Sequence, residues 1–257
     1  MNTLAERLGT RWPLIQAPMA GSQGSALALA VGAAGALGSL PGALLAPEAL
    51  RAELARLAAS GLPYNVNFFC HVPPAPDAAA DTTWRAALAP YYREFGLDAS
   101  AVPAGPGRVP FSAAAAELLA EFRPPVVSFH FGLPAPELLA QVKRWGALVL
   151  SSATTLPEAL WLEEHGADAV IAQGLEAGGH RGHFLSMDLS EQLGTLALVP
   201  QLVARLRVPV IAAGGVADAA GVRAVMALGA AGVQVGTAYL CSHESLASAA
   251  TVGTTTL

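Results

Sequence analysis

The chain of 257 residues has little charge and almost no lysine. Asp, Glu, Lys and Arg together make up 13% of the residues, Lys143 is the only lysine, and the formal net charge is −5. Nucleic-acid binding needs clustered basic side chains that neutralise phosphates, so this composition argues against it. The hydrophobic share of 53% argues against intrinsic disorder, because such a chain can bury enough apolar surface to offset the entropy of ordering.

Cysteine is also scarce. The two cysteines, Cys70 and Cys241, lie far apart and outside any CxxC pair. The sequence therefore predicts neither a disulfide framework nor a metal knuckle. It also lacks an HExxH motif, so we expect no metal. A reducing cytoplasm is the expected compartment.

Charge is absent from residues 12–47, which raises the question of a membrane span. A spanning helix needs about 20 apolar residues. The apolar run 25–40 is shorter and rich in alanine, and Gly, Gln and Pro interrupt both of its ends. We therefore expect a buried strand–helix–strand unit and no membrane span. Residues 1–11 carry three charges before a proline, which is not the pattern of a signal peptide.

Eight short apolar runs alternate with alanine-rich helical stretches. Glycines 61, 146, 166 and 229 follow four of these stretches, as left-handed helix caps do. Strands alternating with helices indicate parallel βαβ units, and eight in about 250 residues are typical of a single-domain (β/α)₈ TIM barrel. An open doubly wound sheet is the alternative, but no GxGxxG follows the first strand. The predicted strands are Leu14–Ala20, Ala36–Leu40, Tyr64–Phe69, Val126–Phe131, Leu148–Ala153, Ala169–Gln173, Val208–Ala213 and Gly232–Tyr239.

A long gap separates the third and fourth predicted strands. We interpret residues 70–125 as a segment inserted at the barrel mouth, either a lid or a surface excursion without function. The aromatic side chains of this segment favour a packed lid. They are Trp84, Tyr91, Tyr92 and Phe95.

Four glycines surround a histidine after the sixth strand, in the stretch Gly174–Gly182. Active sites of such barrels lie at the C-terminal ends of the strands. We therefore expect His180 to be a catalytic acid, base or charge stabiliser, with Gly178 and Gly179 offering backbone amides to a ligand. The alternative is a flexible glycine loop with a solvated histidine.

The seventh and eighth strands also end in small residues. Gly214 and Gly215 follow the seventh strand, and Gly236 and Thr237 belong to the eighth. The loops after these two strands form the recurrent phosphate site of this fold. We expect bare amides and the Thr237 hydroxyl to bind phosphate there, although each glycine pair alone also suits an ordinary turn.

Polar side chains share one face of the third and fourth strands. Asn65 and Asn67 alternate on one face, as do Ser128 and His130. Amides inside a barrel are costly unless they are hydrogen-bonded, which implies a polar ligand or a polar layer. His130 either points into the mouth or is a core histidine bonded to neighbouring groups.

Five motifs resemble the nitronate monooxygenases, formerly called 2-nitropropane dioxygenases, over residues of about 12 to 245. This is a family of FMN-dependent (β/α)₈ barrels. The most specific stretch is Ala172–Gly182, with the sequence AQGLEAGGHRG. The other four motifs are Ile15–Met19, Asn65–Phe68, Ser128–Gly132 and Ile211–Gly215.

The resemblance implies a site at the barrel mouth. The FMN phosphate would lie on Gly178, Gly179, Gly214, Gly215, Gly236 and Thr237. The isoalloxazine ring or ribityl chain would contact Met19, Asn67 and Gln173. His180 would be catalytic, with His130 and either Tyr91 or Tyr92 lining the substrate pocket.

The resemblance also implies the reaction. Alkyl nitronates such as propionate 3-nitronate would be oxidised by O₂ to a carbonyl compound and nitrite, with electrons passing through FMN; a homo-oligomer is possible. Family members continue well past the eighth strand, whereas the C-terminus here is shorter, which leaves closure of the pocket open. The alternatives are an FMN-dependent NAD(P)H reductase of the enoyl-acyl-carrier or quinone type, and a flavin-binding barrel with lost activity.

Overall fold

The computed structural model describes residues 3–98, 101 and 109–248. The chain divides into two compact units, which are described separately below. One consists of Met1–His71 with Pro110–Leu257, and the other is Val72–Val109.

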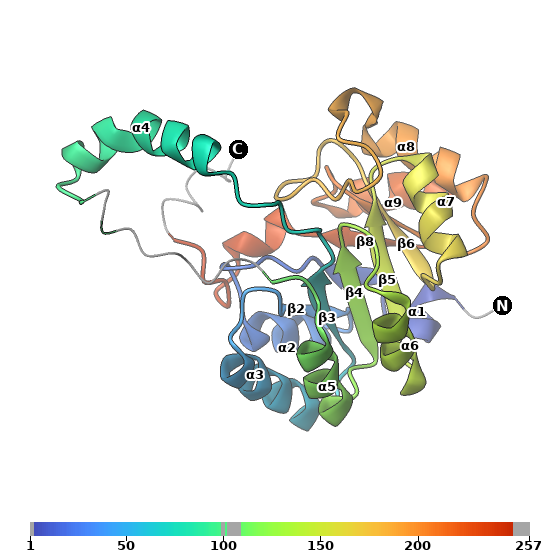
Figure 1. The fold of residues 1–257 in the computed structure, drawn as a ribbon. Helices are drawn as coiled ribbons and strands as arrows, with labels where there is room; N and C mark the ends of the chain where they lie inside the picture. Colours follow the sequence, from blue (N-terminus) through green and yellow to red (C-terminus); the bar gives the residue numbers. More distant parts are fainter. Residues whose placement is uncertain (1–2, 99–100, 102–108, 249–257) are drawn as a thin grey trace. The chain divides into compact units, whose positions relative to one another are not determined.

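The first unit is a parallel barrel of eight strands (Figure 1). Hydrogen bonds connect the strands in the order β1-β8-β7-β6-β5-β4-β3-β2. Leu37 closes the ring, since its N–H donates to Leu14 and its carbonyl accepts from Gln16, both at 2.9 Å. The (β/α)₈ fold is therefore confirmed. The strands are β1 (Leu14–Gln16), β2 (Gly38–Pro41), β3 (Tyr64–Phe69), β4 (Val126–His130), β5 (Leu148–Ala153), β6 (Ala169–Gln173), β7 (Val210–Ala213) and β8 (Gly232–Val235).

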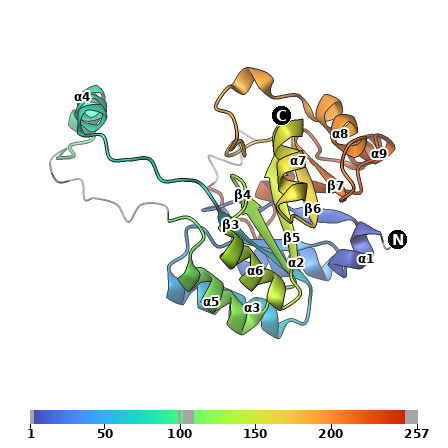
Figure 2. The same ribbon diagram turned by 45° about the vertical axis from the view of Figure 1, so that its right-hand side comes forward.

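Helices connect the strands and cover the outside of the barrel (Figure 2). The glycines expected to end four helices all have positive φ: 69° at Gly61, 86° at Gly146, 101° at Gly166 and 97° at Gly229. The helices of this unit are α1 (Leu4–Leu8), α2 (Ser25–Ala33), α3 (Pro47–Ala59), α5 (Ala113–Phe122), α6 (Pro136–Arg144), α7 (Leu156–Glu164), α8 (Thr195–Val203) and α9 (Ala219–Ala227), with 3₁₀ helices at Leu189–Glu191 and Thr237–Cys241.

Two strands, β1 and β8, are much shorter than the sequence suggested, whereas the bounds of β2, β4 and β7 differ by one or two residues. β1 ends at Gln16, and Pro18 cannot donate a hydrogen bond to extend the ladder. β8 ends at Val235, because Gly236 leaves the extended conformation with φ −115° and ψ −72°. Thr237 therefore begins a 3₁₀ helix instead of lying within a strand.

The interior of the barrel has two chemically different layers. Toward the N-terminal ends of the strands, apolar residues from most of the strands pack against Leu4 and Leu8 of α1. At four places the residue two positions further along is polar: Leu37 is followed by Ser39, Val126 by Ser128, Leu150 by Ser152 and Ile171 by Gln173. Because side chains alternate along a strand, both members of each pair face the interior.

The described residues of the second unit include the long helix α4 (Ala78–Glu94), labelled in Figure 1. Asp77 caps it by accepting hydrogen bonds from the N–H groups of Ala79 and Ala80, both at 3.0 Å. Within this unit the helix buries none of its residues, and the packed lid expected from its aromatic side chains stays a prediction. α5 belongs to the barrel unit, where it contacts α3 and α6, and the assignment of residues 70–125 to one inserted segment stays a prediction.

Candidate active site

The loop after β6 is held by a side chain of the strand itself. Gln173 is the last residue of β6 and is buried. Its Nε2 donates to the carbonyl of His180 at 2.8 Å, and its Oε1 accepts from the N–H of Gly182 at 2.6 Å. One side-chain amide therefore binds the backbone of both neighbours of Arg181. The polar layer of the barrel thus extends directly into the histidine loop.

His130, the last residue of β4, contacts the same loop. Its Nε2 lies 3.1 Å from the carbonyl oxygen of His180, and its Nδ1 lies 3.0 Å from the Ser152 hydroxyl on β5. Burial lowers the pKa of His130 to about 4, and the hydrogen bond to the His180 carbonyl opposes this effect only in part. The ring is therefore neutral at physiological pH.

Arg181 points back into its own loop. Its guanidinium donates to the carbonyls of Gly174 at 3.0 Å and Ala177 at 3.2 Å, and its Nε donates to Gln192 at 3.0 Å. These bonds satisfy turn carbonyls that would otherwise need water. The residue therefore organises the glycine turn, and it is a structural contributor that the sequence pattern did not single out for this purpose.

Two carboxylates tie the loop to the neighbouring helices. Glu176 accepts from the N–H of Thr195 at 2.8 Å and from its hydroxyl at 2.9 Å, which caps α8 from outside. Desolvation raises the pKa of Glu176, but the Thr195 hydrogen bonds outweigh it and hold the pKa below its usual value. Glu158 of α7 is buried and accepts from the N–H groups of Phe184 at 2.6 Å and Leu185 at 3.2 Å.

Aromatic rings surround the His180 side chain. Its ring centroid lies 5.4 Å from Phe69 and 5.9 Å from Phe131, the latter edge to face. Phe131 has φ 67°, a left-handed conformation that is uncommon for an aromatic residue. Strained backbone of this kind concentrates at functional sites. The sequence carries no signal for this strain.

The glycine turns after β6, β7 and β8 meet at the C-terminal rim. A Cβ atom on Gly178 would lie 3.7 Å from the Thr237 hydroxyl, and one on Gly214 would lie 2.8 Å from the N–H of Ala177. Gly215 approaches Glu176 in the same way, at 3.2 Å. A Cβ on Gly179, which has φ 75°, would meet nothing within 4 Å. The turns expected to bind phosphate therefore lie next to one another.

The other expected cofactor contacts lie at the same end of the barrel. A Cβ on Gly236 would be 3.7 Å from the sulfur of Met19, which places Met19 beside the β8 turn. Asn67 donates to the carbonyl of Ser128 at 3.2 Å and to its hydroxyl at 3.0 Å, and Asn65 binds the same hydroxyl at 2.9 Å. Tyr91 and Tyr92 belong to α4 in the second unit, and their place in the substrate pocket stays a prediction.

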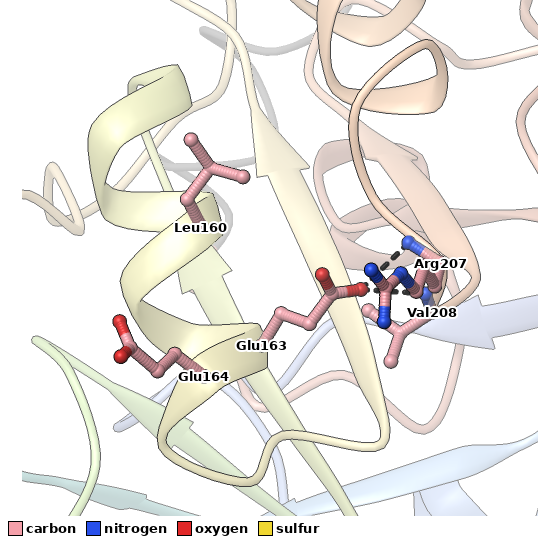
Figure 3. A pocket seen from close by; sticks show the side chains of 5 residues that line it. All are labelled: Leu160, Glu163, Glu164, Arg207 and Val208. Atoms are coloured by element: carbon pink, nitrogen blue, oxygen red, sulfur yellow. Dashed lines mark hydrogen bonds between the residues drawn. The ribbon is translucent and has the colours of Figure 1, made fainter.

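A hollow on the surface lies at the opposite end of the barrel. It is lined by residues at the C-terminal end of α7 and just before β7, among them Leu160, Glu164 and Val208 (Figure 3). Glu163 accepts from the N–H groups of Arg207 at 2.6 Å and Val208 at 2.9 Å. The Glu163 carboxylate therefore fixes the turn before β7. This turn lies at the end of the barrel that contributes to stability, away from the histidine loop.

Two features are absent from the part of the chain that the structure describes. No group of three or more metal-ligating side chains is found there. Over the same residues, no helix has both the length and the apolarity needed to cross a bilayer.

The fold and the rim define a (β/α)₈ barrel with the site arrangement of barrel enzymes. The family model "Nitronate monooxygenase" matches residues 2–256, and the chain belongs to this family. A nitronate monooxygenase of Paraburkholderia phytofirmans is 44% identical, over 93% of this chain and 66% of the relative. One of Pseudomonas aeruginosa is 44% identical, over 95% and 70%. The chain thus spans about two thirds of these relatives.

A solved structure agrees with this assignment. The nitroalkane oxidase of Streptomyces ansochromogenes superposes with a TM-score of 0.86 at 38% sequence identity, over 95% of this chain and 70% of that one. The family suggested by the sequence motifs is therefore confirmed.

Proposed function

We propose that the protein is an FMN-dependent enzyme that oxidises alkyl nitronates with O₂, releasing a carbonyl compound and nitrite. Membership of the nitronate monooxygenase family supports this proposal. The single observation that carries it is the meeting of Gly178, Gly214 and Thr237 with the His180 loop at one rim of the barrel.

The rim fits the phosphate end of FMN. Three turns lack side chains where they approach one another, so backbone amides and one hydroxyl can surround an anion. The phosphate would be held by Gly178, Gly179, Gly214, Gly215, Gly236 and Thr237. Met19, Asn67 and Gln173 would face the ribityl chain or the ring. When bound, FMN supplies the redox chemistry, and the chain supplies orientation and electrostatics.

His180 is the residue proposed to act on the substrate. Its side chain is exposed at the rim, and its backbone is held by Gln173 and His130. An imidazole in this place can donate a hydrogen bond to the nitro oxygens and stabilise their negative charge. The rings of Phe69 and Phe131 lie beside it, with centroids 5.4 and 5.9 Å from that of His180.

The test uses purified protein loaded with FMN. We expect O₂ consumption and nitrite release with propionate 3-nitronate. His180→Asn should retain FMN and lose about 100-fold or more in turnover, the size typical of a missing acid–base or charge-stabilising group. Tight FMN binding without nitrite would contradict the proposal and favour a barrel that only binds flavin. Anaerobic bleaching of the flavin by NADH would instead favour a reductase.

A further inference from the structure

We infer that His130, held by Ser152, is a positioning residue that fixes the backbone of His180, and that it does not itself exchange protons with the substrate. This inference rests on the proposed function, in which His180 acts on the substrate. It differs from the role in lining the substrate pocket that the family resemblance implies for His130.

The carbonyl of His180 is the point where the two fixing groups converge. It accepts from Nε2 of Gln173 at 2.8 Å and faces Nε2 of His130 at 3.1 Å. These donors come from β6 and β4, two strands on either side of β5. An oxygen with two lone pairs held from two strands leaves its peptide plane little freedom. The Cα of His180, and so the origin of its side chain, is fixed with it.

The His180 carbonyl determines which nitrogen of His130 carries the hydrogen, and the Ser152 hydroxyl can adapt to either form. A peptide carbonyl can only accept, so Nε2 of His130 must be the N–H group. Nδ1 then accepts from the Ser152 hydroxyl at 3.0 Å. The neutral ring has one N–H, and the His180 carbonyl uses it, so none remains for a nitro oxygen.

The loop is shaped to admit this contact. A Cβ atom on Gly182 would lie 2.7 Å from Cε1 of His130 and 3.1 Å from Oε1 of Gln173. Any larger residue would push the loop away from both fixing groups. The glycine at position 182 is therefore required by the approach of His130.

The first experiment measures the tautomers of two histidines by ¹⁵N NMR on the full chain without cofactor. We expect His130 to be protonated at Nε2. His165 is an internal control of opposite sign, because its Nδ1 lies 2.7 Å from the carbonyl of Trp161 and must carry the hydrogen. An Nδ1-protonated or rapidly exchanging His130 would overturn the inference, whatever the protein's activity.

The second experiment compares three variants in the FMN-loaded enzyme. His130→Phe keeps a ring but removes the donor, and should lower kcat about tenfold or more, with KM and FMN affinity within about twofold. His130→Gln can donate from its amide and should recover part of kcat. His165→Phe, remote from the rim, should match the wild type. A rise in KM at unchanged kcat for His130→Phe would instead indicate direct substrate contact.

A third measurement keeps the inference separate from the proposed function. In the cofactor-free protein, His130→Phe and the milder Ser152→Ala should both shift the ring resonances of His180, while His165→Phe should not. If the wild type released no nitrite, this result would still decide the positioning role. Unchanged His180 resonances in both variants would refute it.

Discussion

The two ends of the barrel interior differ in what holds them together. At the N-terminal end, apolar side chains such as Ile15, Leu150 and Ile211 pack beneath α1 and are almost completely buried. At the C-terminal end, the interior is a hydrogen-bonded network through Asn65, Ser128 and their neighbours. The first end gains stability from burial alone, whereas the second needs each polar group to find a partner.

This difference teaches how a glycine-rich loop can be ordered. The loop after β6 has few side chains with which to pack, yet polar groups from β4, β6, α7 and α8 hold it, those from β4 and β6 at the same carbonyl. The groups are His130, Gln173, Glu158 and Thr195, together with Arg181 from the loop itself. Near the rim, hydrogen bonds of polar residues therefore hold the chain in place, as apolar packing does at the other end.

The largest expected effect is at the apolar end. Leu150→Ala should lower the free energy of unfolding by about 3 kcal/mol, because it removes a buried side chain and leaves a cavity. FMN affinity should remain within about twofold, since the residue faces the layer below the rim. Urea unfolding and flavin titration measure the two quantities. A loss of FMN binding without a loss of stability would contradict the assignment of stability to the apolar end and of cofactor binding to the polar end.

A smaller effect is expected at two residues with positive φ, which lie at opposite ends of β4. Arg123 ends α5 with φ 49° and precedes β4, while Phe131 follows β4 with φ 67°. Arg123→Gly should stabilise the fold by about 1 kcal/mol, because glycine adopts this conformation without strain. Phe131→Gly relieves similar strain but removes the ring beside His180, so turnover should fall. Thermal unfolding measures the stability of each variant, and nitrite release measures its turnover. If turnover were unchanged in both variants, a functional role for Phe131 would be contradicted.

The smallest effect is the pH dependence that comes from Glu176. Its pKa in the folded protein is below the ordinary value of 4.5, so its contribution to stability is complete above that value and lost as pH falls through the folded pKa. The wild type should exceed Glu176→Gln in stability at pH 7, and the difference should shrink below pH of about 4.5. Because the carboxylate is exposed, solvent screening keeps the effect small. A difference that grew toward acid pH would contradict this sign.

Several features of the fold followed from local pattern. Apolar runs bounded by glycine and proline located all eight strands, and β3, β5 and β6 have the predicted bounds. The resemblance of five motifs identified the family. Strand ends at β1 and β8 were missed because proline and glycine act there on the backbone within otherwise extended-looking sequence.

By itself, the sequence determined the alternation of eight strands with helices, because apolar runs and glycine caps act on the backbone locally. It also placed His180 among glycines at the end of a strand. Only the tertiary structure decided that His130 and Gln173 bind the carbonyl of His180. It also decided that Phe131, next to His130, has a positive φ. Those contacts join segments up to 50 residues apart. Their geometry depends on closure of the ring of strands, which no local pattern encodes.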